Sequence, residues 1–154
     1  MKTSSDNQKL LYRISSLFNS DLKIDRVLAN VLNLTVEQTG ADNGSIIIFD
    51  EMGAVAHKIL ARVGMPPEKQ QAVIAEVLTT GLAGWVVNHR EGSLIADVQA
   101  DERWVSFEDD ILVDGSAVSV PLIRRDRVVG VVTLRHHQKK HFGQEHLSLL
   151  SFLA

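Results

Sequence analysis

Residues 116–137, SAVSVPLIRRDRVVGVVTLRHH, contain two apolar runs separated by the charged tetrapeptide RRDR. Runs rich in β-branched residues on either side of a short polar turn predict a β-hairpin, with strands over 116–123 and 128–137. The second strand has apolar side chains on both faces: Val128, Val132 and Leu134 on one, Val129 and Val131 on the other. This pattern indicates a central strand that is covered from both sides.

A second hairpin is predicted further upstream. GSIIIF (44–49) and AVAHKILA (54–61) are separated by the turn DEMG, and the short run SLIAD (93–97) predicts one more strand. Residues 98–115 form a long polar and aromatic connection. A loop of this length in a small domain is usually functional or mobile.

Helical patterns surround these strands. After the cap residues Asn19-Ser20-Asp21, a set of apolar residues has the spacing of one buried helical face: Ile24, Val27, Leu28, Val31 and Leu32. Gly40 stands where a left-handed C-terminal cap would lie. Further helices are expected between Pro66-Pro67 and Gly81, from Leu82 to about residue 90, and from Gly143 onward. We therefore expect one mostly antiparallel sheet with helices on both faces.

The composition excludes several function classes. The chain has 154 residues, a net charge of -3 and no cysteine. Without cysteine it has no disulfide, thiolate metal site, cysteine nucleophile or thioether-linked chromophore, and a reducing, cytoplasmic location is expected. The charge gives no reason to expect nucleic-acid binding. No apolar run approaches the ~20 residues that span a bilayer, so neither membrane insertion nor a signal peptide is expected.

The stretch GLAGWV (81–86) resembles a glycine-rich phosphate loop, but it follows a predicted helix rather than a strand. A phosphate loop joins a strand to a helix N-terminus and needs further residues that are absent here. We therefore favour a packing role, in which Gly81 ends one helix and Gly84 lets the next one approach the sheet closely.

The histidines suggest a metal hypothesis. His136, His137 and His141 lie in HHQKKH, where Lys139 and Lys140 would repel a cation. We favour a solvated polar turn and expect no metal site. Acidic residues also have a local explanation, because Asx caps account for Asp97 and Asp101. No catalytic constellation is visible, so an enzyme is not expected.

Three segments together resemble a GAF domain: TGADNGSIIIFDEMG, GLAGWVVNHREGSLIADVQADERW and SAVSVPLIRRDRVVGVVTL. The resemblance is to GAF modules of bacterial signal-transduction proteins, with kinase, cyclase or activator outputs, and begins at about Asn19. It implies an α+β, PAS-like fold with a central antiparallel sheet of five to six strands. The terminal helices would cover one face, and the middle helices and the loop the other. Residues 1–18 would form an N-terminal signalling or dimerisation helix. Residues 19–154 would form a single GAF domain, which the uncapped apolar end suggests is truncated within its C-terminal helix.

The resemblance also implies a small-molecule pocket and a homodimer. The pocket residues would be His57, Trp85, Arg103, Trp104, Phe107 and Ser119. Trp104 could instead simply plug its loop onto the core. The dimer contacts would come from the terminal helices, at Leu10, Ile14, Leu17, Leu150 and Leu153. The expected function is a regulatory, small-molecule-sensing module that signals to an output domain through these helices. The alternative is a constitutive dimerisation or interaction module with no diffusible ligand.

The ligand and any cofactor remain unknown from the sequence. Bilin attachment through cysteine is excluded, and the cysteine-dependent reduction of free methionine sulfoxide by some GAF proteins has no nucleophile here. The cyclic-nucleotide signature of the family has only a loose counterpart in Asn88, Phe107 and Asp110, without its lysine. Haem is disfavoured as well, because His57 and His89 are the only inward histidine candidates and an isolated histidine is usually a core residue.

Overall fold

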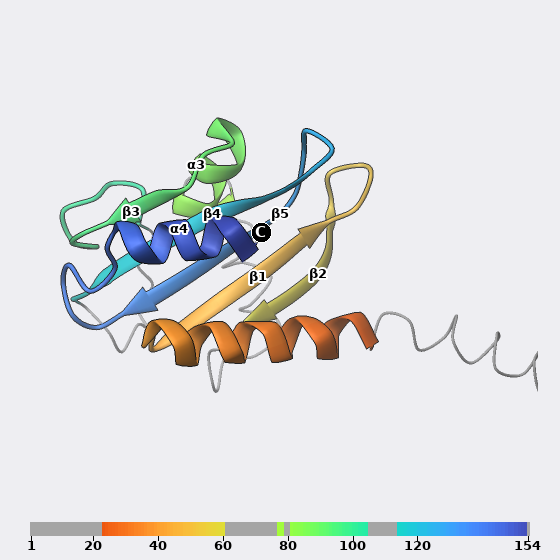
Figure 1. Cartoon of the computed structure of the whole chain (residues 1–154). Helices are drawn as coiled ribbons and strands as arrows, with labels where there is room; N and C mark the ends of the chain where they lie inside the picture. Colours follow the sequence, from red (N-terminus) through yellow and green to blue (C-terminus); the bar gives the residue numbers. More distant parts are fainter. Residues whose placement is uncertain (1–22, 61–76, 79–80, 105–113, 154) are drawn as a thin grey trace, which may run out of the picture.

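The computed structural model describes residues 23–60, 77–78, 81–104 and 114–153, and these form an α+β fold with helices on both faces of one sheet (Figure 1). The helix over residues 23–39 and the helix α4 (Gln144–Leu153) lie on one face. The helix α3 (Leu82–His89) lies on the other. This arrangement confirms the fold class expected from the sequence.

The described sheet has five antiparallel strands in the order β2-β1-β5-β4-β3. The strands are β1 (Asn43–Phe49), β2 (Val55–Leu60), β3 (Ser93–Ile95), β4 (Ser116–Arg124) and β5 (Arg127–His136). The two predicted hairpins, β1–β2 and β4–β5, are confirmed. The last strand, β5, lies at the centre because β1 and β4 pair with its two edges.

Two apolar clusters lie on either side of the sheet. On the face of the terminal helices, Val132 and Leu134 pack with Leu32 and Leu150. On the face of α3, Val131 packs with Leu82 and Val86. The alternation predicted for β5 is therefore confirmed. Gly130 lies in this strand where an added Cβ would come within 2.6 Å of the Ile47 carbonyl oxygen, which explains the need for glycine.

The helix over residues 23–39 differs from its prediction. Leu28 and Leu32 face the sheet, and Thr35 and Thr39 continue that buried face, with their hydroxyls donating to carbonyls one turn earlier. A second apolar stripe remains exposed, at 43%, 59%, 48% and 58%: Ile24, Val27, Val31 and Leu34. The prediction of a single buried face is wrong because this helix has two adjacent apolar stripes, and only one packs on the sheet. Gly40 ends the helix with φ +71°, as predicted.

In the C-terminal helix, the prediction that Leu150 is a dimer contact is wrong. Leu150 is 3% exposed and packs within the core of its own chain, so it is not available to a partner. The apolar pattern of α4 was interpreted as an interface, but it is satisfied by the sheet. The other proposed dimer residues, Leu10, Ile14, Leu17 and the side chain of Leu153, lie outside the described residues, as does the segment 1–18. Within the described part of the chain, no helix is long and apolar enough to cross a membrane.

Candidate functional site

The face of the sheet covered by α3 brings together Trp85, Arg103 and Trp104, which we call the aromatic–arginine cluster. The guanidinium carbon of Arg103 lies 4.7 Å from the centre of the Trp85 ring, within range of a cation–π contact. Both Trp85 and Trp104 pack against the apolar cluster on this face. The sequence placed these three residues in one site, and the structure brings them together.

Hydrogen bonds hold the Arg103 side chain in this position. Its Nε and Nη2 donate to the two carboxylate oxygens of Asp101, at 3.0 and 2.8 Å, and its Nη1 donates to the Ser93 hydroxyl at 2.8 Å. A fork of two parallel bonds fixes the plane of a guanidinium. Hydrogen bonding to Arg103 holds the pKa of Asp101 below its usual value, although partial burial opposes this, and the same bond raises the pKa of Arg103.

The turn before Arg103 is organised by the two predicted Asx caps. Asp97 accepts a bond from the Gln99 amide, and Asp101 accepts one from the Arg103 amide. Side-chain oxygens that bind amides two residues ahead close compact turns. Asp101 therefore both shapes the turn and orients Arg103 over Trp85.

Trp104 adds a buried polar group to this face. Its indole Nε1 is buried and has no hydrogen-bond partner among the described residues. The guanidinium carbon of Arg135, a residue that is 5% exposed, lies 5.2 Å from the centre of the Trp104 ring. A buried indole N–H normally finds a partner, so this donor marks a place that an acceptor could occupy.

A row of hydroxyls crosses the sheet beneath this cluster. The strand registers align Ser45 with Thr133, Thr133 with Ser119, and Ser119 with Ser93. These side chains point toward α3, because their neighbours Ile46, Val118 and Val132 point to the other face. Ser119 is fully buried. Its hydroxyl lies 3.1 Å from the Val132 carbonyl, to which it donates, and 2.9 Å from the Thr133 hydroxyl. Sequence reasoning singled out Ser119 but missed the row, which requires the strand register.

His57 does not lie in the pocket where the sequence analysis placed it. Its Nδ1 lies 2.9 Å from a carboxylate oxygen of Asp25, in the helix over residues 23–39. It therefore lies on the face of the terminal helices, opposite Trp85, and does not share a site with the aromatic–arginine cluster. The sequence indicated an inward position but not which of the two covered faces it occupied. Phe107 lies outside the described residues.

The glycine pair of GLAGWV has a packing role, as expected. Gly81 precedes α3 as its N-cap, and its amide donates to the Val77 carbonyl. An added Cβ on Gly84 would lie 2.2 Å from the Leu78 carbonyl oxygen. Gly84 therefore packs closely against the preceding helical segment. The prediction that its close neighbour is the sheet is wrong.

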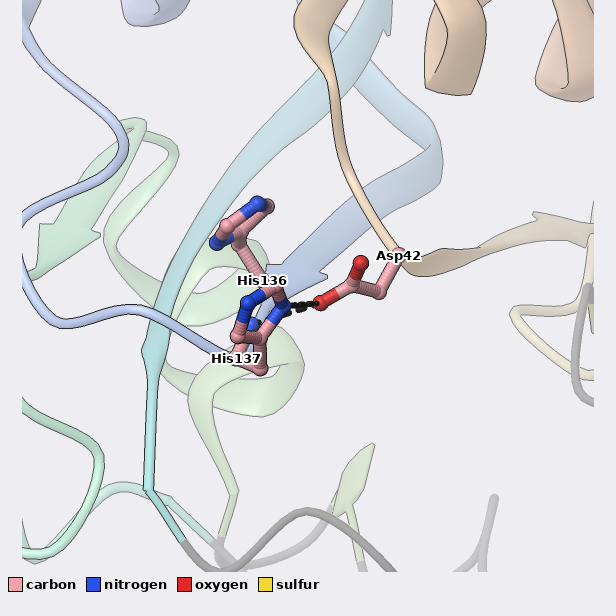
Figure 2. A group of neighbouring side chains, drawn as sticks. All are labelled: Asp42, His136 and His137. Carbon is pink, nitrogen blue, oxygen red and sulfur yellow. Dashed lines mark hydrogen bonds and ion pairs between the residues drawn. The ribbon is translucent and has the colours of Figure 1, made fainter.

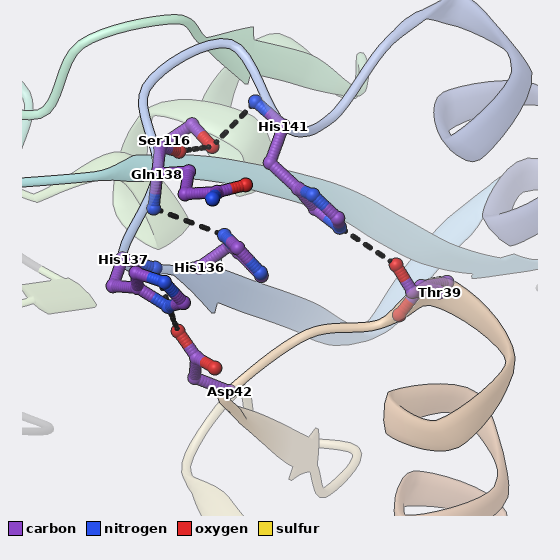
Figure 3. A network of polar contacts seen from close by, with 7 residues as sticks. All are labelled: Thr39, Asp42, Ser116, His136, His137, Gln138 and His141. Carbon is purple, nitrogen blue, oxygen red and sulfur yellow. Dashed lines mark hydrogen bonds and ion pairs between the residues drawn. The ribbon is translucent and has the colours of Figure 1, made fainter.

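A second polar group, which we call the histidine cluster, lies where β5 leads into α4 (Figures 2 and 3). The His136 ring stacks on His141, with centroids 3.6 Å apart, and on His137, with centroids 4.3 Å apart. Asp42 reaches the cluster from the start of β1, and its Oδ2 lies 2.6 Å from both the amide nitrogen and Nδ1 of His137. His136 is buried. The prediction of a solvated turn is therefore wrong for this histidine, because the turn folds back onto the core.

The protonation of the histidine cluster reflects its burial. The pKa of His136 is lowered by burial and by the neighbouring His141. The pKa of Asp42 is lowered even though burial alone would raise it, because the hydrogen bonds from His137 favour the carboxylate. Lys139 lies 3.6 Å from the Asp97 carboxylate, so its charge is directed toward the loop after β3.

Comparison with known proteins identifies the family. The family model described as GAF domain matches residues 21–154. The chain belongs to the GAF domain family. A curated relative, a probable 3′,5′-cyclic phosphodiesterase (pde-5) of Caenorhabditis elegans, is 26% identical over 137 residues. The match covers 83% of this GAF domain but only 18% of the length of that relative.

Solved structures support the same assignment. The GAF domain of an Acinetobacter phosphoenolpyruvate-protein phosphotransferase is 25% identical, with a TM-score of 0.62, covering 99% of this chain and 89% of that one. The corresponding domain from Coxiella burnetii is 19% identical, with a TM-score of 0.65 and coverage of 99% and 90%. A type II free methionine-R-sulfoxide reductase from Thermoplasma acidophilum shares the fold at 14% identity, with a TM-score of 0.63 and coverage of 86% and 88%.

Proposed function

We propose that this GAF domain is the regulatory module of a cytoplasmic signal-transduction protein and binds a small molecule at the aromatic–arginine cluster. Relatives named as a phosphotransferase GAF domain and as a probable cyclic phosphodiesterase support a regulatory setting. Ligand occupancy would alter the packing of the sheet and so bias the terminal helices that lead to an output domain. Such coupling requires the ligand to bind the two helix arrangements with different affinities.

The observation that carries this proposal is the buried, unpartnered Nε1 of Trp104 in the described part of the chain. Leaving a buried donor without an acceptor costs about 1–3 kcal/mol. An acceptor on a bound molecule would recover that energy, while the flat Trp104 ring offers apolar contact area. The ligand class that fits is therefore a small molecule with a flat or apolar body and at least one hydrogen-bond acceptor.

We do not propose a catalytic role. The reductase that shares this fold is an enzyme by its name, and the resemblance implies that such activity depends on cysteine. This chain contains no cysteine. Sulfoxide reductase activity in the purified protein would contradict the regulatory assignment.

Native mass spectrometry of the freshly purified protein, followed by a thermal-shift screen of metabolites, tests ligand binding. We expect a co-purified small molecule or a compound that raises the melting temperature. Trp104→Phe keeps an aromatic ring and removes the N–H, so it should weaken that ligand about five- to tenfold, as expected for one lost hydrogen bond. His57→Gln changes a residue on the opposite face and serves as the matched control.

Two results would refute ligand sensing at this site. One is the absence of any bound or stabilising compound across the screen. The other is a ligand whose affinity is the same in Trp104→Phe and in the wild type, since binding would then not use the indole donor.

A constitutive dimerisation module is the second candidate, and one observation favours it. The exposed stripe Ile24, Val27, Val31 and Leu34 has the alternating three- and four-residue spacing of a coiled-coil seam. A second copy of the chain, presenting the same stripe, would bury these side chains in a homodimer. The two candidates separate experimentally: a dimer whose dissociation constant is unchanged by every bound compound supports the second, and a ligand-dependent dimer supports the first.

A further inference from the structure

We propose that the histidine cluster is a binding site for a divalent transition-metal ion, with Asp42, His136 and His137 as ligands. The three residues each offer a ligand atom, and these atoms all lie within 4.8 Å of one another (Figure 2). Imidazole nitrogen and carboxylate oxygen together suit ions such as Zn²⁺. This site is separate from the aromatic–arginine cluster and does not depend on the function proposed there.

The hydrogen bonds prepare His137 for a metal. Its Nδ1 lies 2.6 Å from the Asp42 carboxylate and must donate its proton there, because an ionised carboxylate only accepts. A metal ion that replaces this proton would be held between the His137 Nδ1 and the Asp42 carboxylate.

Asp42 can also provide a ligand itself. Its Oδ2 receives both bonds from His137, whereas its Oδ1 makes no hydrogen bond or ion pair with the described residues. Asp42 and His137 are both exposed, so their side chains can rotate toward an ion. Ligand atoms around a tetrahedral zinc lie about 3.3 Å apart, given metal–ligand distances near 2.0–2.1 Å. The present group must therefore contract somewhat when it binds.

His136 and His141 complete the arrangement from the buried side (Figure 3). The Nδ1 of His136 accepts the Gln138 amide at 3.0 Å, so a metal at that nitrogen would replace one local hydrogen bond. The Nε2 of His141 donates to the Thr39 carbonyl at 2.8 Å, which leaves its Nδ1 with a lone pair. His141 stacks on His136 and so supports that ring beside the site.

One of the two neighbouring lysines is paired with a carboxylate outside the cluster. In the sequence, the positive charge of Lys139 was a reason to expect no metal ion at these histidines. In the structure, its ammonium group lies 3.6 Å from the Asp97 carboxylate. Asp42 contributes a negative charge within the cluster itself. A bound ion would connect Asp42, which lies between the helix over 23–39 and β1, with the end of β5. It would therefore link the C-terminal end of the helix over 23–39 to the segment that leads into α4.

The test is a titration of the full chain, freed of any polyhistidine tag, at pH 7.5. Co²⁺ serves as the spectroscopic probe and competition with Zn²⁺ gives the affinity. The variants are His137→Gln and Asp42→Asn, both at exposed positions, with His89→Gln as the control that removes one histidine elsewhere. Circular dichroism confirms that each variant is folded.

We expect one equivalent of metal in the wild type and in His89→Gln, with a visible Co²⁺ spectrum typical of nitrogen and oxygen ligands. His137→Gln and Asp42→Asn should each weaken binding at least about tenfold. Absence of one-to-one binding in the wild type overturns the proposal. Equal affinity in the wild type, His137→Gln and Asp42→Asn also overturns it, because the ion would then be held elsewhere.

Discussion

Asp101 shows how much a single residue contributes at the proposed ligand site. It caps the turn, accepts hydrogen bonds from Nε and Nη2 of Arg103, and so fixes the guanidinium over Trp85. Its pKa is lowered in the folded chain, chiefly by the bond from Arg103. A carboxylate with a lowered pKa stabilises the fold above its unfolded pKa, near 3.9, and loses that contribution as the pH falls through its folded pKa.

Asp101→Asn should therefore destabilise the protein by about 1 kcal/mol at pH 7 and flatten the loss of stability in the acid range. Urea unfolding at a series of pH values between 3 and 7 measures this. Asp126→Asn, in the exposed β4–β5 turn, is the matched control and should keep the wild-type slope. An identical pH dependence in Asp101→Asn and the wild type would show that the Arg103 bond adds nothing to stability.

Gly130 provides a second test at the scale of a residue. An added Cβ would meet the Ile47 carbonyl oxygen at 2.6 Å and the Ile48 and Leu122 side chains at 2.9 and 3.1 Å. Gly130→Ala should cost about 1–3 kcal/mol, because the backbone of the neighbouring strand cannot retreat easily. The midpoint of chemical unfolding measures the cost.

Gly53→Asn is the comparison for Gly130→Ala. No atom lies within 4 Å of a Cβ at Gly53, and asparagine tolerates its positive φ of 83°. We expect this variant to lose much less stability. Equal losses at both positions would mean that the close approach at Gly130 is not what requires glycine.

Some residues of the site could be predicted from the sequence and others could not. Asx caps and the left-handed Gly40 depend on local chemistry, so they were predictable. His57 was placed on the wrong face because a strand covered on both sides offers two inward directions, and period-two alternation does not say which is which. The histidine cluster was interpreted as a solvated turn because its contacts join residues that are far apart in sequence, such as Asp42 and His137.

At the scale of an element, the helix over residues 23–39 has two apolar stripes. One packs on the sheet through Leu28 and Leu32, and the other remains exposed in the single chain. A helical wheel groups both stripes into one broad apolar face, and this is why the sequence suggested a single buried surface. For the same reason, Leu150 was predicted to contact a partner chain, although it packs on the sheet of its own chain.

Val27→Glu tests whether the exposed stripe is a dimer seam. Val27 is 59% exposed, so the substitution leaves the monomer core intact while placing a charge in the interface. We expect the dimer dissociation constant to rise about tenfold or more, since each buried valine contributes about 1.5–3 kcal/mol. Analytical ultracentrifugation measures the dissociation constant.

Asn33→Glu adds the same charge to an exposed position of the helix outside the stripe, and should leave association unchanged. Dimers of equal strength in wild type, Val27→Glu and Asn33→Glu would exclude this stripe as the interface. A wild-type chain that is monomeric at all concentrations would exclude it as well.

At the scale of the whole molecule, the order of elements and the sheet were predictable because each hairpin is local in sequence and each strand has a clear period. The pairing of β1 with the last strand, β5, could be reached only through the family resemblance. This pairing joins the two hairpins into one sheet. One face of the sheet has the aromatic–arginine cluster, and the other face is covered by the terminal helices. The histidine cluster lies where β5 leads into α4.

The two tryptophans have an optical consequence. The chain contains two, Trp85 and Trp104, and both lie on the α3 side of the sheet. Their ultraviolet emission therefore originates from that side alone. An event there should change the emission spectrum directly, whereas association of the helices over residues 23–39 should leave it unchanged unless the change is transmitted through the sheet. The native protein is thus already labelled, without any added dye, to show whether its two sides communicate.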